Sequence, residues 1–287
     1  MKNILKLSNN FFLTLLISNF SLNAQVRVQN RIDKGEIVFH GNHMSINFSL
    51  LSTFKANLKR LSGDHYVKTT MTQGMSLGFK YSKTFNKYYS FIIGPEAIVV
   101  GRDFITSFNK TEFSPPLIKD YKLGYRNSYL SDLIISLSLF FEKRIFYNQA
   151  NYFLVDVGGR LNFSTGADFD IFSIYLLNTN NQVYDAGGTD VYANNDQRPW
   201  ISVPINIGHS WLLKNNNLLQ LTLCSNISFT KYVNGTYQIN IPNRPLTEGQ
   251  YSSTGSYVGL SLNYVFTSAN YRLRRAYEKL EKGSSGL

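Results

Sequence analysis

The sequence predicts an all-β fold, namely an eight-stranded antiparallel up-and-down transmembrane β-barrel with short periplasmic turns and long extracellular loops. Three observations predict it. Apolar and small polar residues alternate through segments long enough to cross a bilayer at a tilt. The connections between these segments are alternately short and long, as in outer-membrane barrels. Charged residues make up only 16% of the chain, whereas a soluble domain carries roughly 25%.

The alternation is clearest in residues 131–163, which we interpret as two long strands joined by a turn. One set of alternate positions is apolar: Leu133, Ile135, Leu137, Leu139, Phe141, Phe153, Val155, Val157, Leu161 and Phe163. The positions between them carry small, polar or charged side chains: Ser136, Ser138, Glu142, Asp156, Gly158, Arg160 and Asn162. One face of the pair therefore suits hydrocarbon, and the other suits a narrow polar lumen.

Six further segments repeat this alternation and complete the eight strands. Their ranges are 43–54, 74–85, 88–101, 200–211, 218–230 and 256–266. A soluble barrel would show the same period with its apolar face turned inward. The Ser, Gly and Asn of the polar faces favour a cramped lumen, and aromatic residues gather near the strand ends, as in membrane interfacial girdles.

The connections fall into two classes. The short ones are residues 86–87, 144–150 and 212–217, which places them on the periplasmic rim. The long ones are rich in Asn, Gly, Asp and Tyr, and we expect them to be mobile loops; their ranges are 55–73, 102–130, 164–199 and 231–255. The connection 164–199 can contain a further hairpin near 171–177 and 182–184, which could raise the number of barrel strands.

The chain divides into four parts by composition. Residues 1–24 resemble a signal peptide, with basic Lys2 and Lys6 before a short apolar core; the alternative, an anchor helix, would need a longer core. Residues 25–42 form a periplasmic N-terminal segment, residues 43–266 the outer-membrane barrel, and residues 267–287 a basic periplasmic tail.

The tail combines helically spaced apolar residues with the cations Arg272, Arg274, Arg275 and Lys279. A short amphipathic helix there could lie on anionic outer-membrane lipid or dock a periplasmic or secretion-complex protein. A frayed, solvated end is the alternative. We expect no nucleic-acid partner despite the net charge of +11, because the chain is secreted and carries no nucleic-acid-binding motif.

Five ionisable residues fall on the polar rows of the predicted strands: Lys80, Glu96, Glu142, Asp156 and Arg160. Mixed charges in a narrow barrel can pair with one another and fill the lumen. Two alternatives are a gated or proton-conducting path through the same residues, and a catalytic carboxylate pair.

Other reactive side chains give weaker signals. His40, His43, His65 and His209 show no metal-ligand spacing, so we expect no metal or other cofactor. His209 lies on the lipid-facing row beside Trp211, whereas Ser210 lies on the opposite face, which argues against a catalytic dyad. Cys224 is the only cysteine, and we expect it to pack inside the barrel.

Residues 42–266 resemble the small Gram-negative outer-membrane barrels of the OmpA/OmpX type and the PorT-like outer-membrane β-barrel class. The last predicted strand, Val258 to Phe266, alternates and ends in an aromatic residue, like the terminal assembly signal of these families. Unlike theirs, this chain continues beyond that strand. From the loop asymmetry and the filled lumen, we expect a non-enzymatic protein of the outer membrane that presents loops or joins an envelope or secretion complex. A narrow channel and a lipid-modifying enzyme are the alternatives.

Overall fold

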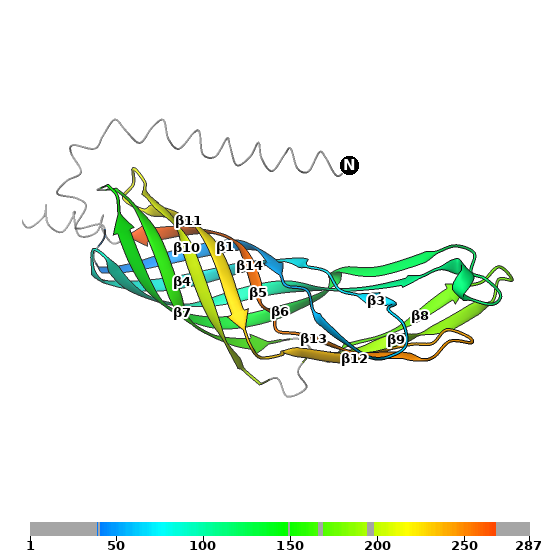
Figure 1. Cartoon of the computed structure of the whole chain (residues 1–287). Helices are drawn as coiled ribbons and strands as arrows, with labels where there is room; N and C mark the ends of the chain where they lie inside the picture. Colours follow the sequence, from blue (N-terminus) through cyan, green and yellow to red (C-terminus); the bar gives the residue numbers. More distant parts are fainter. Residues whose placement is uncertain (1–38, 40, 149, 166–168, 194–197, 268–287) are drawn as a thin grey trace, which may run out of the picture.

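The computed structural model describes residue 39 and residues 41–148, 150–165, 169–193 and 198–267 (Figure 1). The predicted signal peptide, most of the predicted N-terminal segment, and the tail cations Arg272, Arg274, Arg275 and Lys279 lie outside the described residues. In the described part of the chain, no helix is long and apolar enough to span a membrane.

Eight antiparallel strands close into a barrel, which confirms the predicted fold class. They are β1 (Gly41–Thr53), β4 (Thr72–Asn86), β5 (Tyr89–Phe108), β6 (Tyr121–Phe146), β7 (Asn151–Ser164), β10 (Trp200–Leu212), β11 (Leu218–Ser228) and β14 (Tyr257–Thr267). Each strand pairs with the next in this order, and β14 pairs with β1 to close the ring. Both ends of the described chain therefore lie at the rim that carries the short turns (Figure 1), here called the short-turn rim.

The apolar rows of the barrel strands face outward, as predicted. Leu137 and Leu262 are 45% and 46% exposed. Their neighbours Ser138 and Ser261 are buried inside the barrel. A band of exposed apolar side chains around a sealed polar interior is the arrangement of a barrel surrounded by lipid.

The long connections differ from the expected mobile loops, because most of their residues form paired strands. A second, five-stranded sheet consists of β2 (Asn57–Ser62), β13 (Thr247–Ser253), β12 (Val233–Ile239), β9 (Val183–Ala193) and β8 (Phe169–Leu177), in that order. The hairpin expected within 164–199 is present as β8 and β9. It belongs to this second sheet, so it does not enlarge the barrel.

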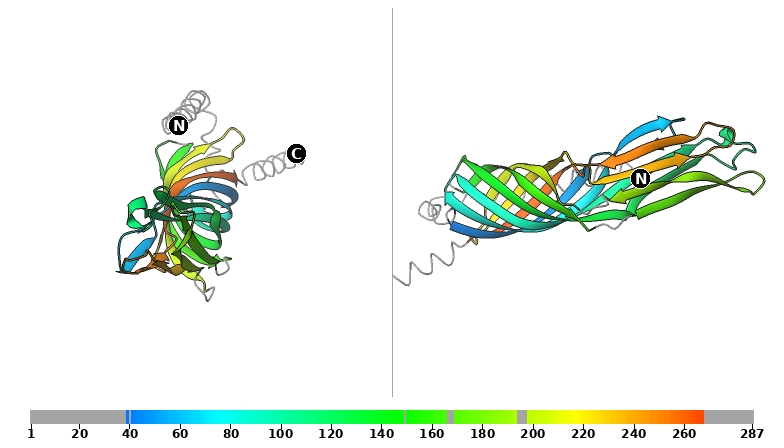
Figure 2. Two further views of the ribbon diagram at one scale, coloured as in Figure 1. Left: turned by 90° about the vertical axis from the view of Figure 1, so that its right-hand side faces the viewer. Right: turned by 90° about the horizontal axis from the view of Figure 1, so that it is seen from below.

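The second sheet packs against extensions of the barrel strands. β5 and β6 continue beyond the barrel and pair there through Asp103–Phe108 and Tyr121–Arg126, and the short strand β3 (Val67–Lys68) joins the edge of β5. Figure 2 shows the two layers projecting from one end of the barrel. We call this two-layered part the sandwich. Its core includes Phe104, whose ring lies 5.9 Å from that of Tyr237 and 6.3 Å from that of Tyr251.

A change of register in β6 connects the two parts. Gly101 pairs with Ser131 and Asp103 pairs with Arg126, so β6 contributes three more residues than β5 at this point. An odd number of extra residues exchanges the two faces of a strand. Odd-numbered residues of β6 such as Leu137 face lipid in the barrel, whereas Tyr121 and Leu123 pack against the core of the sandwich.

Candidate functional site

The centre of the lumen is occupied by a buried ion pair. Nη2 of Arg160 on β7 donates to Oε2 of Glu96 on β5 at 2.6 Å. The other carboxylate oxygen of Glu96 accepts hydrogen bonds from Oγ of Ser76 (2.5 Å) and Nδ2 of Asn47 (3.3 Å). Arg160 also donates to Oγ of Ser138 at 2.8 Å and to the Tyr257 hydroxyl. The pair and its partners thus come from six of the eight barrel strands, and both carboxylate oxygens of Glu96 are hydrogen-bonded.

A second ion pair lies closer to the short-turn rim. Nε of Arg144 donates to Oε1 of Glu142 at 2.6 Å, and both side chains are almost fully buried. Arg144 also donates to the carbonyl oxygen of Phe39 at 3.3 Å, and its guanidinium carbon lies 5.3 Å from the ring centroid of Tyr152. This cluster therefore holds Phe39, which precedes β1, against the inner wall.

The remaining two residues of the predicted network have other partners. Asp156 lies opposite Glu142 in the β6–β7 register and accepts a hydrogen bond from Nδ2 of Asn206 at 3.3 Å. Lys80 is half-buried, and its Nζ lies 5.2 Å from the ring centroid of Phe140. All five predicted residues thus occupy inner rows, but only Glu96 and Arg160 pair with each other.

Apolar side chains close the lumen on both sides of these charges. Toward the short-turn rim, an aromatic and aliphatic cluster fills the interior: Phe39, Phe146, Tyr152, Leu154, Leu212, Leu218 and Val265. Toward the sandwich, Ile98, Val100 and Ile134 belong to the same hydrophobic core as the sandwich itself. Because both ends are packed, the described residues leave no wide aqueous path through the lumen.

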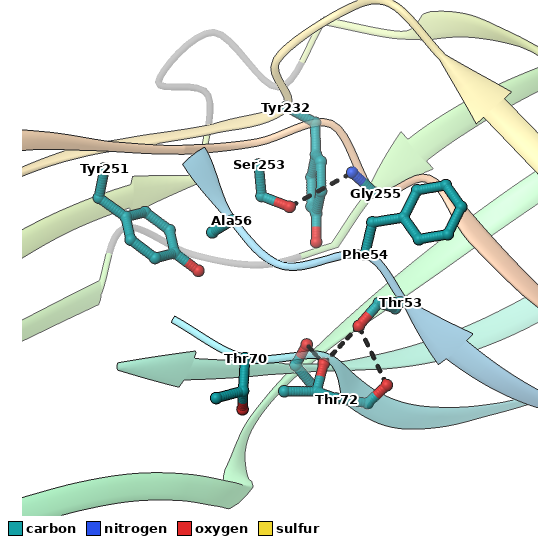
Figure 3. A pocket seen from close by; sticks show the side chains of 10 residues that line it. Thr53, Phe54, Ala56, Thr70, Thr72, Tyr232, Tyr251, Ser253 and Gly255 are labelled. Atoms are coloured by element: carbon teal, nitrogen blue, oxygen red, sulfur yellow. Dashed lines mark hydrogen bonds between the residues drawn. The ribbon is translucent and has the colours of Figure 1, made fainter. Parts of the chain in front are cut away.

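Aromatic contacts join the barrel to the sandwich. The ring of Trp200, at the start of β10, stacks on that of Tyr232 with centroids 5.0 Å apart and planes 15° apart. The Tyr232 hydroxyl donates to Oδ2 of buried Asp132 at 3.1 Å. Beside Tyr232 lies a small cavity of about 10 Å³, whose lining residues are shown in Figure 3. That volume holds about one water molecule, so this cavity is too small for an organic ligand.

The histidines that the structure describes do not form a reactive cluster. Nε2 of His209 lies 2.7 Å from the Tyr147 hydroxyl, and its ring contacts Phe153 and Trp211 on the outer surface near the short-turn rim. Ser210 is buried on the opposite face. His43 is buried and His65 is exposed, whereas His40 lies outside the described residues. No group of three potential metal ligands occurs among the described residues.

Sequence reasoning missed several members of the lumen clusters. The short turn predicted over residues 144–150 includes Arg144, but Arg144 lies two residues after Glu142 and continues the same inner row to the end of β6 at Phe146. Tyr257 was assigned no role. Continuing the alternation by one step would have identified Arg144. The contact between Tyr257 and Arg160 has no sequence signal, because it joins strands that are remote along the chain. Cys224 is buried within the barrel, as expected.

The exposed apolar band and the sealed polar interior together decide the structural class. The chain is a transmembrane β-barrel. No family model matches it, and no curated protein matches it. Similar solved structures include the outer-membrane protein OprG from Pseudomonas aeruginosa, with 11% identity, a TM-score of 0.41, and coverage of 80% of this chain and 99% of OprG.

Two further barrels show weaker likeness. Ail, the attachment invasion locus protein of Yersinia pestis, solved with the heparin analogue sucrose octasulfate, has 12% identity and a TM-score of 0.30 over 79% of this chain and 99% of Ail. The translocator domain of the autotransporter NalP from Neisseria meningitidis has 8% identity and a TM-score of 0.31 over 78% of this chain and 86% of that domain. These values are low, so the class rests on the barrel's own geometry.

Proposed function

We propose that this is a non-enzymatic protein of the outer membrane whose barrel anchors the sandwich at the cell surface, where the sandwich binds another macromolecule. The observation that carries this proposal is the continuity of β5 and β6, which run from the barrel into the sandwich around one hydrophobic core. A packed junction of this kind holds the sandwich in a fixed position on the membrane. In this orientation the short-turn rim faces the periplasm.

The outer face of the five-stranded sheet supports a location in water. Asn234, Thr236 and Gln238 of β12 are exposed, as are Gln250 of β13 and Lys59 of β2. Amide, hydroxyl and ammonium groups can hydrogen-bond to a polar partner. The outward-facing rows of the barrel strands are mostly apolar instead. The sandwich is therefore suited to recognition of a polar surface, or to membership of an envelope or secretion complex.

Site-directed labelling tests the orientation. Thr236→Cys places a thiol on the exposed face of the sandwich, and the matched Lys214→Cys places one in the turn between β10 and β11. In intact cells, a membrane-impermeant maleimide should label Thr236→Cys at once and Lys214→Cys only after lysis. The unmodified chain, with buried Cys224 alone, sets the background. The reverse labelling pattern would contradict the proposal.

Conductance measurements test the anchoring role against a channel role. Purified protein in planar bilayers should give no large, stable conductance, because the lumen is filled by ion pairs and closed by apolar clusters. A stable open state in the unmodified chain would replace the proposal with a channel function. An open porin in the same bilayers is the positive control, and Glu96→Ala/Arg160→Ala should stay closed because the apolar clusters at both ends of the lumen remain.

A further inference from the structure

The barrel wall contains an irregularity between β4 and β5. Residues of β4 pair with β5 at Gly78 and again at Tyr81, but not at Phe79 and Lys80, which lie opposite Pro95 and Gly94. Proline has no amide hydrogen to donate, and it is rarely found inside a sheet because it removes a ladder hydrogen bond. The outward-facing ring of Pro95 therefore lies at a point where the wall is locally unpaired.

A groove lies on the outer surface at this irregularity. It has a volume of about 530 Å³, within the range of roughly 300–1,000 Å³ found for ligand sites. Its walls come from the lipid-facing rows of β1, β4, β5, β6 and β14, and its floor reaches the inner-row residues Ser45, Lys80 and Gly94. The lipid-facing members are Met44, Ile46, Phe79, Tyr81, Ile93, Pro95, Leu137 and Phe266. A groove so apolar in a membrane-spanning wall suits a hydrocarbon chain.

Two lysines lie beside this groove, toward the short-turn rim. Lys83 follows Phe79 and Tyr81 on the outward row of β4, and Lys143 occupies the outward row of β6; both are exposed. Among the described residues, these are the only lysines on the lipid-facing rows of the barrel strands. Exposed Phe85 and Ile145 follow them on the same rows, so the lysines lie within the last part of the apolar band, and their long side chains can extend along the wall to bring the ammonium groups to lipid headgroups.

The cross-strand register brings the two lysines within reach of one ligand. Lys83 pairs with Phe91, which pairs with Phe141, and Lys143 pairs with Tyr89. Two strand spacings and two residues along a strand place their Cα atoms about 12 Å apart. Between them, the rings of Tyr89 and Phe141 stack with centroids 5.5 Å apart. The lysines therefore flank a flat aromatic surface that one headgroup can cover.

We propose that this part of the wall is a binding site for one phospholipid of the leaflet at the short-turn rim. The phosphate would lie between Lys83 and Lys143, and an acyl chain would fill the groove at Pro95. That this leaflet is the periplasmic one rests on the proposed orientation, but the site itself does not. A second interruption of the wall lies at Pro204, opposite Gly158, yet Pro204 is buried and the outward row nearby carries His209 and Trp211. The cationic site is therefore particular to the β4–β6 wall.

Native mass spectrometry of the full chain in detergent tests this site, with added phosphatidylglycerol as the probe. The unmodified protein should retain one lipid, and Lys83→Gln/Lys143→Gln should weaken retention by about tenfold or more. Lys214→Gln removes a lysine from a turn at the same rim and should leave retention unchanged. Ile93→Trp, which fills the groove while keeping both lysines, should also displace the lipid.

Two results would overturn the proposal. One is equal retention by the unmodified protein and Lys83→Gln/Lys143→Gln. The other is equal loss in the double variant and in Lys214→Gln, which would indicate attraction by net charge alone. The gel mobility of unheated samples verifies that each variant is folded. Lipid retention in detergent does not depend on which side of the membrane the sandwich occupies, so this experiment and the cysteine labelling can fail separately.

Discussion

The barrel and the sandwich share the strands β5 and β6, but the polarity of their inward-facing and outward-facing side chains is opposite. In the barrel, β5 turns Ile93 outward and Glu96 inward, so apolar groups meet lipid and an ion pair fills the interior. In the sandwich, the inward row of the same strand carries Phe104 and Phe108, and the outward row includes the exposed Ser107. The polarity of the side chains on each face of a strand therefore indicates whether that face meets lipid, water or the protein interior. This polarity does not by itself show whether the strand belongs to a barrel.

The largest expected effect comes from breaking the charge pair that distinguishes the barrel interior. Arg160→Met leaves the Glu96 carboxylate buried without its cation, which should cost about 3–5 kcal/mol of stability. Urea unfolding in detergent, followed by the mobility of unheated samples on gels, measures this loss. Glu96→Gln/Arg160→Met removes both charges and should recover most of the stability. If the single variant unfolds like the unmodified protein, the pair is not structural.

A smaller effect should follow from placing the same charge on the outer face of each region. Leu262→Arg introduces a cation into the middle of the lipid-facing band and should cost about 2–4 kcal/mol. Thr236→Arg lies on the water-facing sheet of the sandwich and should change stability by no more than about 0.5 kcal/mol. Unfolding in lipid vesicles measures both variants. Equal costs would mean that the two outer faces meet the same solvent.

The smallest expected effect is a pH dependence of the free energy of unfolding that comes from one residue of the sandwich. Burial, aided by Glu112 and Asp64, raises the pKa of Tyr66 to about 12. Between pH 10 and 12 the unfolded phenol loses its proton while the folded one keeps it, so stability is intact below pH 10 and falls as the pH rises through this window. The loss is on the order of 1 kcal/mol. Tyr66→Phe should remove this part of the alkaline destabilisation.

The fluorescence of Trp200 can measure that change. The chain has two tryptophans, and Trp211→Phe leaves Trp200, which is buried at the junction and stacked on Tyr232. Unfolding curves recorded in this background at pH 9 and pH 11, with and without Tyr66→Phe, isolate the contribution of Tyr66. An identical pH dependence in both proteins would assign the alkaline effect to other groups.

The barrel could be predicted from the sequence because each of its strands repeats one local pattern for ten residues or more. The sandwich was missed for two physical reasons. Most of its strands are short, with seven residues in β12 and two in β3, so each of these offers few alternations. Its pairings are also remote along the chain, as between Lys59 and Gln250. The period of β12, with Val233, Tyr237 and Ile239 all buried, was nevertheless visible within the expected loop.

The charged residues of the lumen were predictable as a row but not as pairs. Alternation places Glu96, Glu142 and Arg160 on the inside without stating which strands lie across the lumen from one another. Partner choice depends on barrel closure, and the pairing of β1 with β14 is set by the whole strand order. The function of the sandwich depends on the chemistry of its surface. The alternation of apolar and polar residues does not predict what that surface binds.

The strand order of the second sheet also constrains how the molecule is assembled. Its two neighbouring strands β2 and β13 come from the first and last long connections, and β12 joins them to a hairpin from the third. Loop closure over such distances is slow, because entropy is lost before contacts form. A finished sandwich could not pass through an interior filled with side chains. In the proposed orientation, each connection would therefore reach the cell-surface side of the bilayer as unpaired chain, and the pairings between different connections could form only after that.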